Sequence, residues 1–165
     1  MRNRRVQNEK RVTVDLGALI QTVVESKQAS MPKPRLEKSC NTCFVAAEKN
    51  RLANVLAHLI DNAQQATADD GVVEVALVRD ADMHVIQISD SGHGMDADFI
   101  RTRLFKPFDT TKGNAGMGIG MYESREFVRG LGGKLNVRSE PGKGTTISLQ
   151  IPVSAESSDA LSVDI

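Results

Sequence analysis

The sequence lacks several features that would place it in a common functional class. No apolar run approaches the roughly 20 residues that a membrane-spanning helix needs, and no signal peptide is recognisable. The 21 basic and 21 acidic side chains cancel, so nothing in the charge indicates nucleic-acid binding. No Gly-x-x-x-x-Gly-Lys-Ser/Thr pattern occurs, which excludes the P-loop nucleotide-binding classes. We therefore expect no direct membrane contact and no nucleic-acid partner.

Cysteine is also scarce, since Cys40 and Cys43 are the only two in the chain. Their Cys-x-x-Cys spacing is found in redox pairs and in zinc half-sites, but the other two ligands of a four-cysteine zinc site are missing. The usual outcome for such a pair is two reduced cytosolic thiols beside a strand. We therefore expect free thiols and a cytoplasmic location.

The length of 165 residues, with 40% hydrophobic and 25% charged residues, suits one domain with one core. Residues 1–11 contain five basic side chains and no apolar periodicity, which indicates a basic arm or the end of a truncated upstream segment. Residues 154–165 are rich in Ser, Asp and Ala and are expected to be a disordered tail. The folded domain is expected to span residues 12–153.

The apolar patterns predict an α+β domain. The clearest helix covers residues 49–66, where apolar residues recur at helical spacing. Further helices are expected after the N-cap Asp15, after Asp96 as far as about Arg103, and over residues 118–129. Two prolines make residues 31–35 a connector. Expected strands cover residues 12–14, 44–47, 72–78, 83–89, 134–138 and 145–151. Antiparallel strand pairs with amphipathic helices predict a two-layer α/β sandwich.

A column of polar residues lies beside the apolar stripe of the 49–66 helix. His58, Asn62 and Gln65 stand at positions i, i+4 and i+7, roughly 90° from the stripe. An amide oxygen in this column can ligate Mg²⁺, which prefers oxygen ligands. The alternative is an ordinary polar helix flank.

The strand that ends at Asp90 places an acidic side chain on its inward face, by period-2 alternation with Ile86 and Ile88. An unpaired charge facing the helix layer is costly, and a ligand that donates a hydrogen bond, such as the exocyclic amino group of adenine, would remove that cost. Gly92 and Gly94 would let the backbone pass close to a base, although an Asp-Ser-Gly turn is common by itself. Thr145 is expected on the inward face with Ile147 and Leu149.

A third glycine segment, Gly116-x-Gly118-x-Gly120, precedes a predicted helix, whose free N–H groups can receive phosphates. It is not the dinucleotide fingerprint, which needs Gly-x-Gly-x-x-Gly after a strand. Without a P-loop lysine, Lys112 is the best candidate to meet a γ-phosphate. The glycines around it suit a mobile lid over about residues 105–116. Phe105 and Phe108 could anchor this lid or simply pack in the core.

Five segments in this order resemble the N, G1, F, G2 and G3 boxes of the catalytic and ATP-binding domain of sensor histidine kinases. The similarity extends over residues 12–153. It implies the Bergerat or GHKL fold, in which a mixed, mostly antiparallel sheet is covered on one face by helices. The five segments are His-Leu-Ile-Asp-Asn-Ala-Gln-Gln-Ala at 58–66, Asp-Ser-Gly-His-Gly-Met at 90–95, Leu-Phe-Lys-Pro-Phe-Asp-Thr-Thr-Lys at 104–112, Gly-Met-Gly-Ile-Gly at 116–120 and Gly-Lys-Gly-Thr-Thr at 142–146.

The resemblance also implies roles for single residues. Asn62 would bind the Mg²⁺ that bridges the ATP phosphates, and Thr145 would join the adenine network. His58 and Lys112 are the catalytic candidates: His58 stands where related ATP hydrolases have a glutamate, and it could act as a base or orient a phosphate. No proline follows His58, so it does not resemble the phosphorylated histidine. The implied ATP-binding set is Asn62, Gln65, Asp90, Gly92, Gly94, Met95, Phe105, Thr111, Lys112, Gly116, Met117, Gly118, Ile119, Gly120 and Thr145.

The function implied is transfer of the ATP γ-phosphate to a histidine on a separate dimerisation and phosphoacceptor domain, followed by relay to a response regulator. Nothing before Asn41 provides a long helical hairpin with a histidine, so the acceptor domain is expected elsewhere in a parent that could be membrane-anchored. Catalysis would consist mainly of positioning and charge neutralisation. Two alternatives remain, a GHKL ATPase that drives a clamp and a serine kinase of the anti-sigma type.

Overall fold

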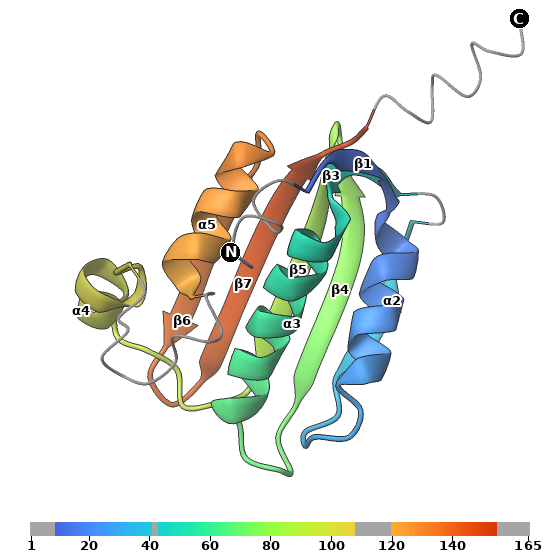
Figure 1. The fold of residues 1–165 in the computed structure, drawn as a ribbon. Coiled ribbons are helices and arrows are strands. Elements are labelled where there is room, and N and C mark those ends of the chain that lie inside the picture. The colour runs from blue at the N-terminus through green and yellow to red at the C-terminus, as the bar shows by residue number, and fades with distance from the viewer. Residues whose placement is uncertain (1–8, 41–42, 108–119, 155–165) are drawn as a thin grey trace, which may run out of the picture.

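The structure is a computed structural model that describes residues 9–40, 43–107 and 120–154. Its main feature is a five-stranded sheet with the strand order β2-β4-β5-β7-β6 (Figure 1). β2 and β4 run parallel, and the other neighbouring pairs are antiparallel. The strands are β2 (Arg35–Lys38), β4 (Val73–Asp80), β5 (Met83–Asp90), β6 (Lys134–Glu140) and β7 (Gly144–Pro152).

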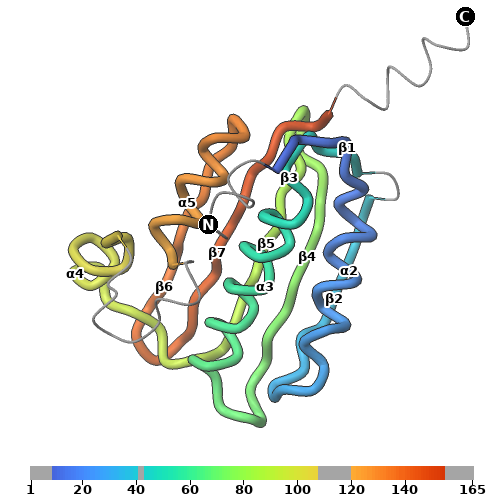
Figure 2. The backbone as a smooth tube through the Cα atoms, viewed as in Figure 1, coloured from blue at the N-terminus to red at the C-terminus, as the bar shows by residue number. Residues whose placement is uncertain are grey.

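Three helices cover one face of this sheet: α2 (Leu16–Ser26), α3 (Lys49–Gln65) and α5 (Met121–Gly130) (Figures 1 and 2). The apolar residues of α3 recur every three or four positions, so one side of the helix is buried against the strands. Leu52, Leu56 and Leu59 are fully buried with Ile86 and Ile88 of β5. The predicted two-layer α+β sandwich is therefore confirmed.

A separate ribbon of two antiparallel strands, β1 (Arg11–Asp15) and β3 (Phe44–Glu48), connects to the first helices. The Asp15 carboxylate accepts a hydrogen bond from the Ala18 N–H at 3.2 Å and caps α2, as predicted. Glu9 accepts hydrogen bonds from the first N–H groups of α3, those of Asn50 and Arg51, at 2.7 and 3.1 Å. This contact ties the described part of the N-terminal segment to the domain.

The sequence did not predict β2, and Arg35, placed in the connector, is its first residue. Of its four residues only Leu36 is apolar, and it is half-buried. β2 forms because its backbone pairs in parallel with β4, distant in sequence. A non-local pairing of this kind leaves no periodic pattern in a four-residue segment.

The remaining helical segments follow the predictions closely. α4 (Ala97–Phe99) starts after Asp96, whose side chain accepts a hydrogen bond from the Phe99 N–H at 2.8 Å. The π-helical turn η1 (Ile100–Leu104) continues it. The helix expected over residues 118–129 begins, within the described residues, at Met121. Across the segments described, no helix combines the length and the apolar character needed to cross a bilayer.

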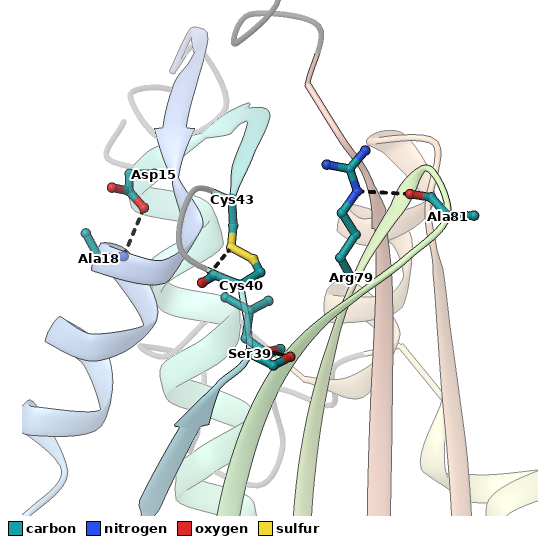
Figure 3. The surroundings of a disulfide bond; sticks show 8 residues. Asp15, Ala18, Ser39, Cys40, Cys43, Arg79 and Ala81 are labelled. Atoms are coloured by element: carbon teal, nitrogen blue, oxygen red, sulfur yellow. Dashed lines mark hydrogen bonds between the residues drawn. A yellow bond between two sulfur atoms is a disulfide. The ribbon is translucent and has the colours of Figure 1, made fainter.

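The expectation of two free thiols was wrong, because Cys40 and Cys43 are joined by a disulfide (Figure 3). Both lie on the connection between β2 and β3. This connection brings their Cα atoms to 6.4 Å, within the range that a disulfide can bridge. Backbone hydrogen bonds hold the two ends: the Ser39 N–H donates to Leu77 O at 2.9 Å, and Leu16 N–H donates to Cys43 O at 2.7 Å.

Candidate functional site

A pocket of about 420 Å³ opens between α3, the ends of β5 and β7, and the segment that carries α4 and η1. Its walls are mainly apolar, with a few polar side chains placed among them, which is typical of small-molecule sites. The lining residues are Leu59, Asn62, Ala63, Gln65, Ala66, Ile88, Asp90, His93, Met95, Phe99, Leu104, Met121, Thr145 and Ile147.

Asp90 lies at the end of β5, where the strand leaves the sheet and its side chain reaches the pocket. Its Oδ1 accepts hydrogen bonds from the Gly92 N–H at 2.8 Å and from the Thr145 N–H at 3.3 Å. Burial raises the pKa of this carboxyl above its ordinary value, while the two N–H donors and nearby His93 oppose the shift. Among the described residues, no hydrogen bond reaches Oδ2. Asp90 is thus a half-buried acceptor aimed at an apolar pocket.

Ser139 of β6 connects Thr145 to the loop that follows β5. Its hydroxyl lies 2.8 Å from Oγ1 of Thr145, its partner in the β6–β7 pair, and donates to Gly144 O at 3.0 Å. The Met95 N–H donates to the same hydroxyl at 2.8 Å. Ser139 therefore positions two pocket residues without lining the pocket itself.

The glycines after Asp90 are required by contacts between segments of the protein. A Cβ on Gly92 would collide with the carbonyl of Ala66 at the end of α3. Gly94 has a φ of 72°, and a Cβ there would collide with the carbonyl of Glu140. Neither glycine lines the pocket. Their visible role is to let the loop pack against α3 and the β6–β7 turn.

His58 and Asn62 lie one turn apart on α3. Asn62 lines the pocket, and its Nδ2 is 3.1 Å from Nε2 of His58. The amide nitrogen can only donate, so Nε2 of His58 is the acceptor. Burial lowers the pKa of His58 below 6.5, opposed by Asp61 and Glu123, and a neutral ring fits this acceptor role. With Nδ2 engaged by His58, the amide oxygen of Asn62 is left to act towards the pocket.

Two other residues predicted to bind ATP, Phe105 and Gly120, do not line the pocket. Phe105 packs against the core, and the Arg125 guanidinium lies 4.4 Å from the centre of its ring. Gly120 is the N-cap of α5, whose first residue, Met121, lines the pocket. Most of the predicted lid lies outside the described residues, as do Phe108, Thr111, Lys112, Gly116, Met117, Gly118 and Ile119.

The structure thus brings Asn62, Gln65, Asp90, Met95 and Thr145 to one pocket. Sequence reasoning missed the apolar walls and Ser139. Ser139 could have been found from the predicted hairpin, since it stands opposite Thr145 there. The walls come from residues that the periodicity assigned simply to the core. The missed lining residues are Leu59, Ala63, Ala66, Ile88, His93, Phe99, Leu104, Met121 and Ile147.

Comparisons with known proteins show to which protein family the chain is similar. The family model described as histidine kinase-, DNA gyrase B-, and HSP90-like ATPase matches residues 47–155. The sensor histidine kinase ZraS of Escherichia coli K12 is 33% identical over 150 residues, covering 88% of this chain and 32% of ZraS. Sporulation kinase C of Bacillus subtilis is 28% identical over 144 residues, covering 87% of this chain and 31% of that protein. The chain thus spans about a third of the length of these relatives.

Solved structures show the same fold. The catalytic domain of the histidine kinase ThkA superimposes with a TM-score of 0.70 at 22% identity, covering 87% of this chain and 97% of that one. Full-length ShkA in complex with AMPPNP gives a TM-score of 0.72 at 23% identity, covering 87% of this chain and 31% of ShkA. The chain therefore belongs to the family of histidine kinase-, DNA gyrase B- and HSP90-like ATPases, as a GHKL catalytic domain of the sensor histidine kinase kind.

Proposed function

We propose that this domain binds ATP with Mg²⁺ and transfers the γ-phosphoryl group to a histidine on a separate dimerisation domain. The family accounts for ATP binding. The observation that carries the proposal is that Asp90, Thr145 and Asn62 all line one pocket. This arrangement offers a hydrogen-bond acceptor to a base and an amide oxygen to a cation.

The adenine end of the pocket would be the one at Asp90. Oδ1 is held by two backbone N–H groups, so the carboxylate is oriented before any ligand binds. Oδ2 can then accept a hydrogen bond from the exocyclic amino group of adenine. Ile88 and Ile147, which are partners in the β5–β7 pair, supply apolar surface in the same pocket. Thr145, fixed by Ser139, would complete the polar contacts to the base.

The phosphate end would be formed by α3 and the N-terminus of α5. Asn62 offers one amide oxygen, which suits Mg²⁺ because this ion usually takes one or two protein oxygens together with phosphates. Bound Mg²⁺ would neutralise phosphate charge. His58 would position Asn62 through the bond to Nδ2. Lys112, Thr111 and the Gly116-to-Gly120 segment remain predicted phosphate contacts.

The wider role follows from the family relationship. The relatives are about three times as long as this chain, so the acceptor histidine would come from another segment of the parent. One structure similar in fold is the kinase ThkA in complex with the response regulator TrrA. We infer that the parent of this domain passes its phosphate to a response regulator and that this domain lies in the cytoplasm.

Transfer in trans tests the proposal. With γ-labelled ATP and Mg²⁺, the isolated chain should label itself negligibly, because none of His58, His84 and His93 can swing in line with the γ-phosphate. It should label the parent's dimerisation domain when that domain is added. The product should be acid-labile and base-stable, as expected for phosphohistidine.

The matched control is the same dimerisation domain with its acceptor histidine replaced by alanine, which should remain unlabelled. An acid-stable phosphoserine on the partner would support the serine-kinase alternative instead. Steady ATP hydrolysis by the chain without transfer to any partner would support the ATPase alternative. Either result would contradict the proposed function.

A further inference from the structure

His84 on β5 is a buried polar residue without a hydrogen-bond partner. Its side chain is 0% exposed. Neither ring nitrogen makes a hydrogen bond to any residue in the described part of the chain. Leaving a buried polar group unsatisfied costs free energy, and a bound ion is one of the explanations for such a group in a folded protein.

The two cysteines on the β2–β3 connection lie beside His84. The Sγ atoms of Cys40 and Cys43 and a ring nitrogen of His84 all lie within 4.8 Å of one another. Cys43 and His84 are buried, and Cys40 is half-buried. Figure 3 shows the cysteine pair on the β2–β3 connection, with Ser39 beside it and Arg79 of β4 in the same view. Three donors from two distant segments thus meet at one place.

We propose that, when the two cysteines are reduced, Cys40, Cys43 and His84 bind one Zn²⁺ ion. Two thiolates and one imidazole are a zinc-binding donor set that leaves a fourth position open. Zn–S and Zn–N bonds of about 2.3 and 2.0 Å place tetrahedral S and N ligands roughly 3.5 Å apart and two S ligands roughly 3.8 Å apart. The Sγ–N distances, which now lie within 4.8 Å, therefore have to shorten by at most about 1.3 Å. The two Sγ atoms move apart once the bond between them is broken. The partial exposure of Cys40 gives water access to the fourth position.

The charge of such a site suits its burial. Two thiolates and one Zn²⁺ sum to zero, so the complete site carries no net charge into the protein interior. The imidazole must be neutral to ligate. A disulfide alone would leave both His84 nitrogens unsatisfied, whereas the zinc site uses one of them.

Disulfide formation and zinc binding exclude each other, because a sulfur in a disulfide is no thiolate. To open the bond, a dithiol or phosphine reductant must deliver two electrons, and each sulfur takes up one proton. Zn²⁺ binding then releases these two protons. The site is also distinct from the nucleotide pocket, since His84 and Asp90 lie six residues apart on β5, roughly 20 Å along the strand.

Cobalt titration of the chain in two redox states tests the proposal. The whole chain, reduced with a phosphine that is then removed without oxygen, should bind one equivalent of Co²⁺. The complex should show thiolate-to-cobalt charge-transfer absorption and tetrahedral d–d bands, and Zn²⁺ should displace the cobalt. The same chain in its disulfide form should show none of these bands. Equal binding in both states, or no binding by the reduced chain, would overturn the proposal.

Substitutions identify the ligands. Cys40→Ser, at the half-buried position, should reduce metal affinity at least about tenfold and weaken the charge-transfer band. His84→Gln should lower affinity while thiolate absorption persists. His93→Gln, which removes a histidine at the nucleotide pocket, should bind metal as the wild type does. Circular dichroism checks that each variant folds. If His84→Gln does not fold, the Cys40→Ser result decides, and an unchanged affinity there would refute the site.

Discussion

Nδ2 of Asn62 donates a hydrogen bond to Nε2 of His58 at 3.1 Å, across one turn of α3. This contact fixes which end of the Asn62 amide can act on a ligand. Because the nitrogen is occupied, the oxygen is the group offered to the pocket. The contact also supports a positioning role for His58, whose Nε2 is engaged as an acceptor. The proposed metal contact therefore depends on two residues.

The first prediction concerns Asn62. Asn62→Ala should weaken ATP binding about tenfold with Mg²⁺ present and less than about twofold in its absence, because only the metal-bound complex uses the amide oxygen. Calorimetry in Mg²⁺ and in EDTA measures both values. Asn54→Ala, at an exposed position of the same helix, is the control and should change neither. An equal loss in both conditions would argue against a metal contact.

The second prediction concerns the pH dependence of stability. The pKa of His58 is lowered in the folded protein, so the unfolded chain binds the proton more readily. The free energy of unfolding should therefore fall as the pH drops below about 6.5. His84 has the same direction of shift and contributes to the same fall.

Comparison of His58→Gln with the wild type separates the contribution of His58 to this pH dependence from that of His84. Denaturant unfolding between pH 5 and pH 8 should show a shallower decline in the variant, with the His84 contribution remaining. At pH 8 the ring of His58 in the wild type is neutral in both the folded and the unfolded state, so a difference in stability there does not come from its titration. Identical pH profiles would contradict a buried neutral His58.

The third prediction concerns Asp90. Burial raises the pKa of the Asp90 carboxyl in the folded state. At a pH above this raised pKa, the buried carboxylate therefore lowers the free energy of unfolding. Asp90→Asn removes this cost and retains an oxygen that can accept from Gly92 and Thr145. At pH 7 without nucleotide, the variant should therefore unfold at a temperature no lower than the wild type.

The same variant should bind ATP at least about tenfold more weakly, since a hydrogen bond to a charged group contributes about 1.5–3 kcal/mol. Thermal unfolding and calorimetry give the two measurements. Asp80→Asn, on the exposed end of β4, should alter neither. Unchanged ATP affinity in Asp90→Asn would refute the adenine contact.

The sequence predicted the features that depend on local patterns. The α3 stripe and the two hairpins were found because each is specified by residues close together in the chain. The inward positions of Asp90 and Thr145 follow from strand alternation, and Thr145 is buried as expected. These elements carry most of the candidate site.

The features that were missed depend on contacts between distant segments. β2 forms through its parallel pairing with β4. His84 meets Cys40 and Cys43 only because β5 runs beneath the β2–β3 connection. Gly94 is required by the Glu140 carbonyl across the loop, a contact that the sequence did not reveal; its expected approach to a base stays a prediction. No period or spacing in the sequence carries such information.

The fourth prediction separates two destabilising effects of replacing glycine by alanine. One is the strain of a positive φ, and the other is a collision of the added Cβ with the backbone. Gly94 and Gly142 both have positive φ, 72° and 81°, but only Gly94 has a backbone atom where a Cβ would lie. Gly142→Ala should cost about 1 kcal/mol of stability through φ alone. Gly94→Ala should cost more, because the Glu140 carbonyl must move. Denaturant unfolding compares them, and equal costs would mean that the loop adapts freely.

The last prediction concerns Ser139, which lies behind the pocket. Its hydroxyl accepts from the Met95 N–H at 2.8 Å and lies 2.8 Å from Oγ1 of Thr145. Ser139→Ala should leave the Met95 N–H without its acceptor and Thr145 free to rotate. We expect ATP affinity to fall about fivefold, in line with the roughly 1 kcal/mol of one neutral hydrogen bond.

Ser148→Ala, on the neighbouring strand β7, is the matched control, since Ser148 lies on the opposite face from the buried Ile147 and Leu149. Calorimetry should show wild-type ATP affinity for this control. Thermal unfolding should show both variants folded at the assay temperature. If Ser139→Ala binds ATP like the control, Thr145 and Met95 do not depend on Ser139 for their positions, and the pocket is organised by the backbone alone.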